Sequence, residues 1–117
     1  MKDYVLLYRG GDPNWRSKAS PQEIGAIMEK WGAWMANLQK TDQLVSGGSP
    51  LESAGKRLTK SGEVVTDIAS SELKELVTGY SIVRARNIED AVVIARACPI
   101  HRFHDATVEV REVMKMS

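Results

Sequence analysis

The chain has 117 residues, of which 43% are hydrophobic and 26% are charged, the composition of a single folded domain. Its net charge of +1 excludes the strongly basic surface of most nucleic-acid-binding domains, and no apolar run approaches the ~20 residues of a membrane-spanning helix. The N-terminus lacks the apolar core of a signal peptide, and the single cysteine, Cys98, excludes an internal disulfide, so we expect a cytoplasmic protein.

The first predicted element is a β-strand over residues 3–9. Its alternate side chains are apolar on both faces, with Tyr4, Leu6 and Tyr8 on one and Val5 and Leu7 on the other. Such a strand belongs in the centre of a sheet that is covered on both sides. Residues 10–20 follow as a turn rich in glycine, aspartate and proline, with an isolated Trp15.

The second element is a helix that begins after Ser20 and ends near Lys40. Ser20, Pro21 and Glu23 form a capping-box pattern. Apolar residues then recur at helical spacing at Ile24, Ile27, Met28, Trp31, Met35 and Leu38. Gly25, Gly32 and Ala36 line a stripe beside this apolar face, and a stripe without side chains predicts that another backbone or a ligand comes close there.

The middle of the chain predicts short strands. Leu44-Val45 is a strand that ends in a turn at residues 46–48, and residues 55–67 form a hairpin around a two-residue Ser61-Gly62 turn. Residues 69–76 are expected to form one helical turn or a structured loop.

The last third of the chain predicts a strand, a helix and a strand. Residues 77–86 form a strand with Tyr80 and Ile82 on one face and Val83 on the other. Asn87 caps a helix over residues 88–98, Pro99 follows it, and residues 106–114 form a strand with Val108 and Val110 pointing inward.

This order, β-α-β-hairpin-β-α-β, predicts an α+β fold: a ferredoxin-like sandwich in which two helices cover one face of a mainly antiparallel sheet. The other face also carries apolar residues, and a small domain rarely leaves such a face in water. We therefore expect a homodimer formed through the open sheet face.

Residues 65–80, VTDIASSELKELVTGY, resemble the YCII-related family, specifically its DGPF subgroup. The matching positions are Val65, Thr66, Asp67, Glu72, Lys74, Glu75, Gly79 and Tyr80. The N-terminal YVLLY, the helix IEDAVVIARACP and the closing VEVREVM are also similar to the family. The resemblance implies a dimeric ferredoxin-like α+β barrel over residues 1–117, with a ligand cleft between helix and sheet.

Two departures limit what the resemblance implies about activity. The Gly-Pro-Phe of the subgroup motif is replaced by Ile68-Ala69-Ser70. In addition, the founding branch carries its proposed catalytic histidine on the first helix, where this chain has WGAWMANL and no histidine. The His–Asp pair of that branch is therefore not transferred to this chain.

The candidate catalytic residues are Asp67, Glu72 and Tyr80. Two carboxylates at a strand end and in the following turn can converge on one pocket and serve acid–base chemistry, while Tyr80 would donate a hydrogen bond to a substrate oxygen. In the alternative interpretation Asp67 caps the turn, Glu72 and Lys74 are solvated and Tyr80 belongs to the core. The candidate ligand-binding residues are Tyr8, Met28, Trp31, Gly32, Met35 and Lys74, although a stripe that includes Met28, Trp31, Trp34 and Met35 is also typical of plain core.

Both histidines lie in the segment CPIHRFHD. Cys98, His101, His104 and Asp105 supply zinc-ligand types, but no second ligand pair accompanies them, and we interpret the segment as a helix end in which Cys98 packs as a small hydrophobe. We expect no cofactor, since Gly10-Gly11 and Gly47-Gly48 lack the following helix of a phosphate-binding loop.

Two main functions remain open from the sequence, with metal binding through residues 98–105 as a third possibility. In the first, the domain binds a small organic molecule in a cleft between helix and sheet and acts as a lyase- or isomerase-like acid–base enzyme. In the second, it is a non-catalytic regulatory or protein-interaction module with a vestigial cleft.

Overall fold

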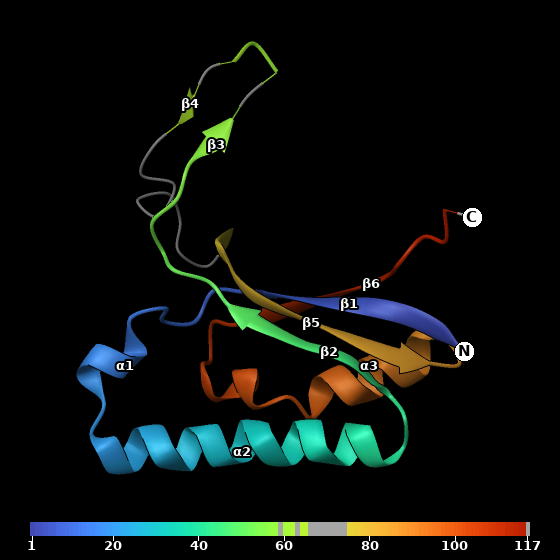
Figure 1. Ribbon diagram of the computed structural model, residues 1–117. Coiled ribbons are helices and arrows are strands. Elements are labelled where there is room, and N and C mark those ends of the chain that lie inside the picture. Colours follow the sequence, from blue (N-terminus) through green and yellow to red (C-terminus); the bar gives the residue numbers. More distant parts are fainter. Residues whose placement is uncertain (59, 63, 66–74, 117) are drawn as a thin grey trace.

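The structure, a computed structural model, describes residues 1–58, 60–62, 64–65 and 75–116. A four-stranded antiparallel sheet has the strand order β2-β5-β1-β6. Its strands are β1 (Lys2–Arg9), β2 (Leu44–Pro50), β5 (Val77–Ala85) and β6 (Thr107–Glu112). Two helices, α2 (Pro21–Lys40) and α3 (Ile88–Arg96), lie on one side of this sheet (Figure 1). The predicted α+β, ferredoxin-like fold is confirmed.

The core forms where β1 and β5 meet the two helices. Tyr4, Leu6 and Tyr8 of β1 share one face, as the alternation predicted, and the structure buries this face against the helices together with Val83 of β5. Burying an apolar side chain of this size contributes roughly 1.5–3 kcal/mol. Val108 of β6 packs against the same cluster, so the predicted inward face of the last strand is also confirmed.

Helix α2 begins and ends at the predicted residues. The Glu23 N–H donates to Ser20 Oγ (3.2 Å) and the Ser20 N–H donates to Glu23 Oε1 (3.4 Å), a capping box of the kind worth ~1 kcal/mol. Trp34 is buried at 7% exposure and its Nε1–H donates to the Ile94 carbonyl oxygen of α3 (3.3 Å). This bond and the surrounding apolar contacts hold the two helices together over the sheet.

No backbone of the described residues makes the close approach that was expected at the glycine stripe of α2. Gly25, Gly32 and Ala36 are exposed. A Cβ at Gly25 or Gly32 would have no other atom of the described structure within 4 Å. The stripe lies outside the packed face of α2, because the helix turns Trp34 and Leu38 toward the core instead.

Strand β2 corrects the predicted turn at residues 46–48. The strand continues through Gly47 and Gly48 to Pro50, with register shifts against β5 between Leu44 and Ser46 and between Ser46 and Ser49. Gly48 has φ +68°, and a Cβ there would collide with the Tyr80 carbonyl oxygen. The glycines therefore mark an irregular strand, the other common use of glycine in a sheet.

The predicted hairpin forms outside the main sheet. β3 (Arg57–Leu58) pairs with β4 (Val64–Val65) in a separate two-stranded ribbon, which Figure 1 shows on the side of the sheet away from the helices. Leu58 pairs with Val64, which centres the turn on Ser61. A two-residue Ser61-Gly62 turn would instead centre the pairing between Ser61 and Gly62, so the expected turn is wrong. The predicted loop at 69–76 lies largely outside the described residues.

Two short helices stand at one end of the sheet. α1 (Trp15–Lys18) forms within the predicted turn, and the 3₁₀-helix η3 (Pro99–Arg102) follows α3. The N-cap of α3 forms as predicted, with the Asp90 N–H donating to Asn87 Oδ1 (2.9 Å). α3 ends at Arg96, two residues before the predicted end, and Pro99 opens η3. Both short helices reach the candidate site described below.

The sheet face opposite the helices carries an apolar centre with a charged border. Cross-strand pairing sets Val5 beside Ile82 and Leu7 beside Tyr80, and these four side chains are half-buried. The flanking ion pairs are Arg84–Asp3 at 3.4 Å, Arg9–Glu109 at 3.7 Å and Arg111–Glu109 at 3.7 Å. The apolar composition predicted for this face is therefore present on β1 and β5.

None of the helices in the described part of the chain combines the length and the hydropathy that crossing a membrane requires.

Candidate functional site

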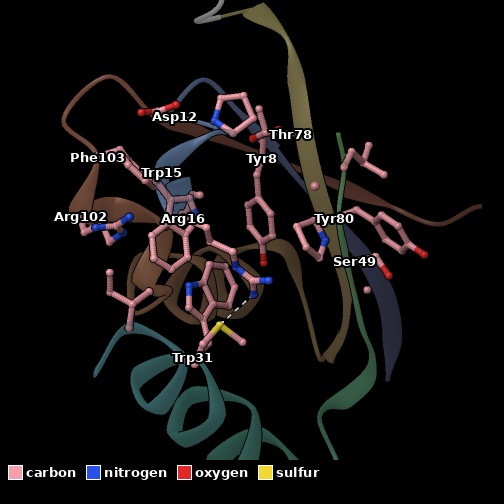
Figure 2. Close-up of a pocket in the computed structure, with 18 of the residues that line it drawn as sticks. Tyr8, Asp12, Trp15, Arg16, Trp31, Ser49, Thr78, Tyr80, Arg102 and Phe103 are labelled. Carbon is pink, nitrogen blue, oxygen red and sulfur yellow. Dashed lines mark hydrogen bonds between the residues drawn. The ribbon is translucent and has the colours of Figure 1, made fainter. Parts of the chain in front are cut away.

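A cavity of about 210 Å³ lies between α2, the sheet, α1 and η3. Most of its wall is apolar, and the large side chains that line it include Trp15, Ile27, Met28, Trp31, Met35 and Phe103. Figure 2 shows these elements arranged around Tyr8, whose ring points from the sheet toward Trp31. Helical spacing explains the α2 side of the wall, because residues three and four apart share one face.

Tyr8 supplies the sheet side of the wall. Its hydroxyl donates to Ser81 Oγ (2.7 Å), Ser81 Oγ donates to the Gly47 carbonyl oxygen (2.9 Å), and the Cys98 thiol lies 3.6 Å from the Tyr8 hydroxyl. Burial, reinforced by the neighbouring Cys98, raises the pKa of Tyr8 far above its usual range. The phenol is therefore neutral at physiological pH, and its hydroxyl group is engaged as the donor of the hydrogen bond to Ser81 Oγ.

Aromatic contacts connect the cavity to the core. The Trp31 ring meets Tyr8 edge-on with centroids 5.7 Å apart and meets Trp34 edge-on at the same distance. Such pairs contribute about 0.5–1.5 kcal/mol beyond their buried area. The sequence allowed Met28, Trp31, Trp34 and Met35 to be either pocket lining or core. In the structure Trp34 belongs to the core, whereas Met28, Trp31 and Met35 line the cavity.

Among the described residues, those that line the cavity and carry a charge are Asp12, Arg16 and Arg102. Asp12 is engaged already, since Lys18 Nζ donates to its Oδ2 (2.8 Å) and the Asn14 N–H donates to its Oδ1 (2.9 Å). The hydrogen bond from Lys18 is the main reason that the pKa of Asp12 is lowered, and the positive charge of Arg102 adds a smaller effect in the same direction. Asp12 is consequently an ionised, paired carboxylate and a poor proton donor.

The predicted ligand-binding residues mostly meet at this cavity. Tyr8, Met28, Trp31 and Met35 line it. Gly32 does not: it is exposed and open on the outer side of α2, so its predicted place at the cleft is corrected. Lys74 lies outside the described residues.

The predicted catalytic residues are not brought together within the described structure. Asp67 and Glu72 lie outside the described residues. Tyr80 borders the cavity, but Figure 2 shows its ring extending away from Tyr8 and Trp31, because residues 80 and 82 share the open face of β5. The ring thus lies on the opposite side of the sheet from the phenol of Tyr8.

The segment after α3 forms a helix end. Cys98 is buried in the core at 2% exposure, as expected for a small hydrophobe, and burial raises the pKa of its thiol. His101 Nε2 donates to the Ala95 carbonyl oxygen (2.9 Å) near the end of α3. Among the residues that the structure covers, no group of three or more His, Cys, Asp or Glu side chains is placed to hold a metal ion.

Sequence reasoning missed the charged mouth of the cavity. Arg16 comes from α1, in a segment predicted as a turn, and Arg102 comes from η3, which follows the predicted helix. The signals available were the isolated Trp15 and the neighbouring Arg102-Phe103. Nothing in the sequence placed residues 15 and 102 side by side.

Comparison with known proteins gives one finding about the family. No curated protein gives a significant match to the sequence. Among protein-family profiles, the YCII-related domain matches residues 4–117, nearly the whole length of the chain. With the strand order and the helix placement described above, this match leads to one conclusion: the chain belongs to the family of YCII-related domains.

Proposed function

We propose that this domain binds a small organic molecule in the cavity between α2 and the sheet. The observation that carries the proposal is an apolar hollow of about 210 Å³ that stays open although Met28, Trp31 and Met35 surround it. Ligand sites in proteins are mostly apolar hollows with a few placed polar groups. The alternative, an interaction module with a vestigial cleft, predicts that these same side chains fill the cavity. The cavity is open instead, which supports the binding function.

A lyase- or isomerase-like acid–base reaction is the narrower proposal. It depends on Asp67, Glu72 and Tyr80, and the first two lie outside the described residues. Two titratable lining groups have shifted pKa values: the pKa of Tyr8 is raised and that of Asp12 is lowered, so both shifts lead away from pH 7. A general acid or base works best when its pKa lies near the operating pH. The described geometry therefore supports binding more strongly than proton transfer.

We also infer a homodimer formed through the open sheet face. Its support is the apolar centre formed by Val5, Leu7, Tyr80 and Ile82 with ion pairs along its border, the arrangement of an apolar interface core with a polar rim. Membership in the DGPF subgroup, which rests on the pattern at residues 65–80, and a cytoplasmic location stay predictions.

The binding function is tested by an NMR titration with benzyl alcohol, a neutral single-ring probe. We expect the amide signals of Met28, Trp31 and Gly47 to shift at millimolar probe. Met28 is half-exposed and lines the cavity, so Met28→Ala should weaken binding about fivefold, the effect of losing ~1 kcal/mol of apolar contact.

The matched control is Met114→Ala, which removes an exposed methionine of the C-terminal segment and should leave the affinity unchanged. Shifts that avoid the cavity residues, or equal effects of the two methionine substitutions, would contradict the proposal.

A further inference from the structure

We propose that the ligand of this cavity is an organic anion, specifically a small carboxylic acid with a single-ring apolar body, whose carboxylate binds Arg16 and Arg102. This inference rests on the proposed function and names the chemical class of the molecule bound. It is carried by the arrangement of charge at the mouth of the cavity, where two guanidinium groups from separate elements border the same apolar hollow (Figure 2).

The guanidinium groups of Arg16 and Arg102 both lie close to the Trp15 ring. The Arg102 guanidinium lies 4.7 Å from the centroid of the Trp15 ring and 4.0 Å from that of Phe103, and the Arg16 guanidinium lies 5.6 Å from Trp15. These are cation–π distances. They place both guanidinium groups beside aromatic rings that line the cavity.

Within the part of the chain that the structure describes, these two guanidinium groups have no carboxylate within ion-pair distance. The hydrogen bond of Arg16 among the described residues goes to the Met28 thioether sulfur (3.3 Å), a weak acceptor. Other arginines do form ion pairs with carboxylates, namely Arg9, Arg84, Arg86 and Arg111. A ligand carboxylate would accept the two parallel N–H bonds that a guanidinium offers.

The other lining residues and the cavity volume indicate the charge, the size and the apolar part of the ligand. Asp12 pairs with Lys18, so the described residues around the cavity leave the positive charges of Arg16 and Arg102 in excess. The volume of about 210 Å³ is smaller than the roughly 300–1,000 Å³ of sites for drug-sized ligands. Trp31, Met28 and Met35 provide aromatic and thioether surfaces that favour a ring. A nucleotide is too large and too polar for this space.

The test compares benzoate, phenylacetate and 3-phenylpropionate with their neutral amides, with affinities measured by NMR titration. We expect at least one acid to bind about tenfold more tightly than its amide, the usual effect of a charge-assisted hydrogen bond. This preference should shrink in 1 M salt, where the Debye length falls to ~3 Å.

The variants assign the preference to the two arginines. Arg16→Gln and Arg102→Gln, singly and combined, should remove the acid's advantage while amide binding persists, which also shows that the cavity is intact. Arg86→Gln, a substitution of an exposed arginine outside the cavity lining that pairs with Asp90, is the matched control for net charge and should change nothing.

The outcomes separate the two proposals. Equal binding of acids and amides to the wild-type protein, or an acid preference that survives in the double variant, would overturn this inference and leave the binding function standing. Failure of every acid and amide to shift the cavity signals would overturn the proposed function and this inference together.

Discussion

Replacing Gly48 by alanine should lower the free energy of unfolding by about 3 kcal/mol or more, at the upper end of single-residue effects. Gly48 has φ +68°, where a residue with a Cβ is strained by roughly 1–2 kcal/mol. The added Cβ would also collide with the Tyr80 carbonyl oxygen of the neighbouring strand, and backbone cannot rotate away as a side chain can. Thermal unfolding should show a midpoint lower by ~10 °C or more.

Two other glycines separate the contributions. Gly62 has φ +84°, but no atom of the described structure lies within 4 Å of the position that a Cβ would take, so Gly62→Ala should cost only the conformational strain, ~1 kcal/mol. Gly32 is helical, exposed and open, so Gly32→Ala should stabilise the protein by about 0.5–1 kcal/mol. Equal effects of Gly48→Ala and Gly62→Ala would show that β2 does not approach β5 as described.

Replacing Ile82 by lysine should convert the protein from dimer to monomer. Ile82 lies beside Val5 in the apolar centre of the open sheet face, and a lysine ammonium buried between two such faces would lose its hydration without a partner. Sedimentation should give twice the chain mass of 12.9 kDa for the wild-type protein at micromolar concentration and 12.9 kDa for the variant.

Val93→Lys is the matched control for this substitution. Val93 is an exposed aliphatic residue of α3, on the helical side of the sheet, so the control should remain dimeric. Circular dichroism on each variant separates loss of the interface from loss of the fold. A mass of 12.9 kDa for the wild-type protein at micromolar concentration would contradict the proposed homodimer.

The fold was predictable where local chemistry and burial agree. The capping box fixed the start of α2, and the alternation of β1 identified which side chains share a face of the sheet. The turn at residues 46–48 was predicted wrongly because glycine serves turns and irregular strands alike. Only the neighbouring strand, whose Tyr80 carbonyl approaches Gly48, decides between these uses.

The candidate site was predictable only in its apolar half. Helical spacing placed Met28, Trp31 and Met35 on one face, and they do line the cavity. The charged half depends on α1 and η3, two short helices that are far apart in the sequence and meet only in the folded chain. Arg16 and Arg102 therefore carried no local signal that they share a site.

The central claim, that a small molecule enters the hollow between α2 and the sheet, is tested most directly by labelling the methionine methyl groups with ¹³C. The chain has five methionines; Met28 and Met35 line the cavity, whereas Met1, Met114 and Met116 are exposed elsewhere. With bound 3-phenylpropionate, we predict nuclear Overhauser effects from the ligand ring to the methyl groups of Met28 and Met35 alone. Contacts to Met1, Met114 or Met116 in their place, or no contact at saturating ligand, would contradict the account.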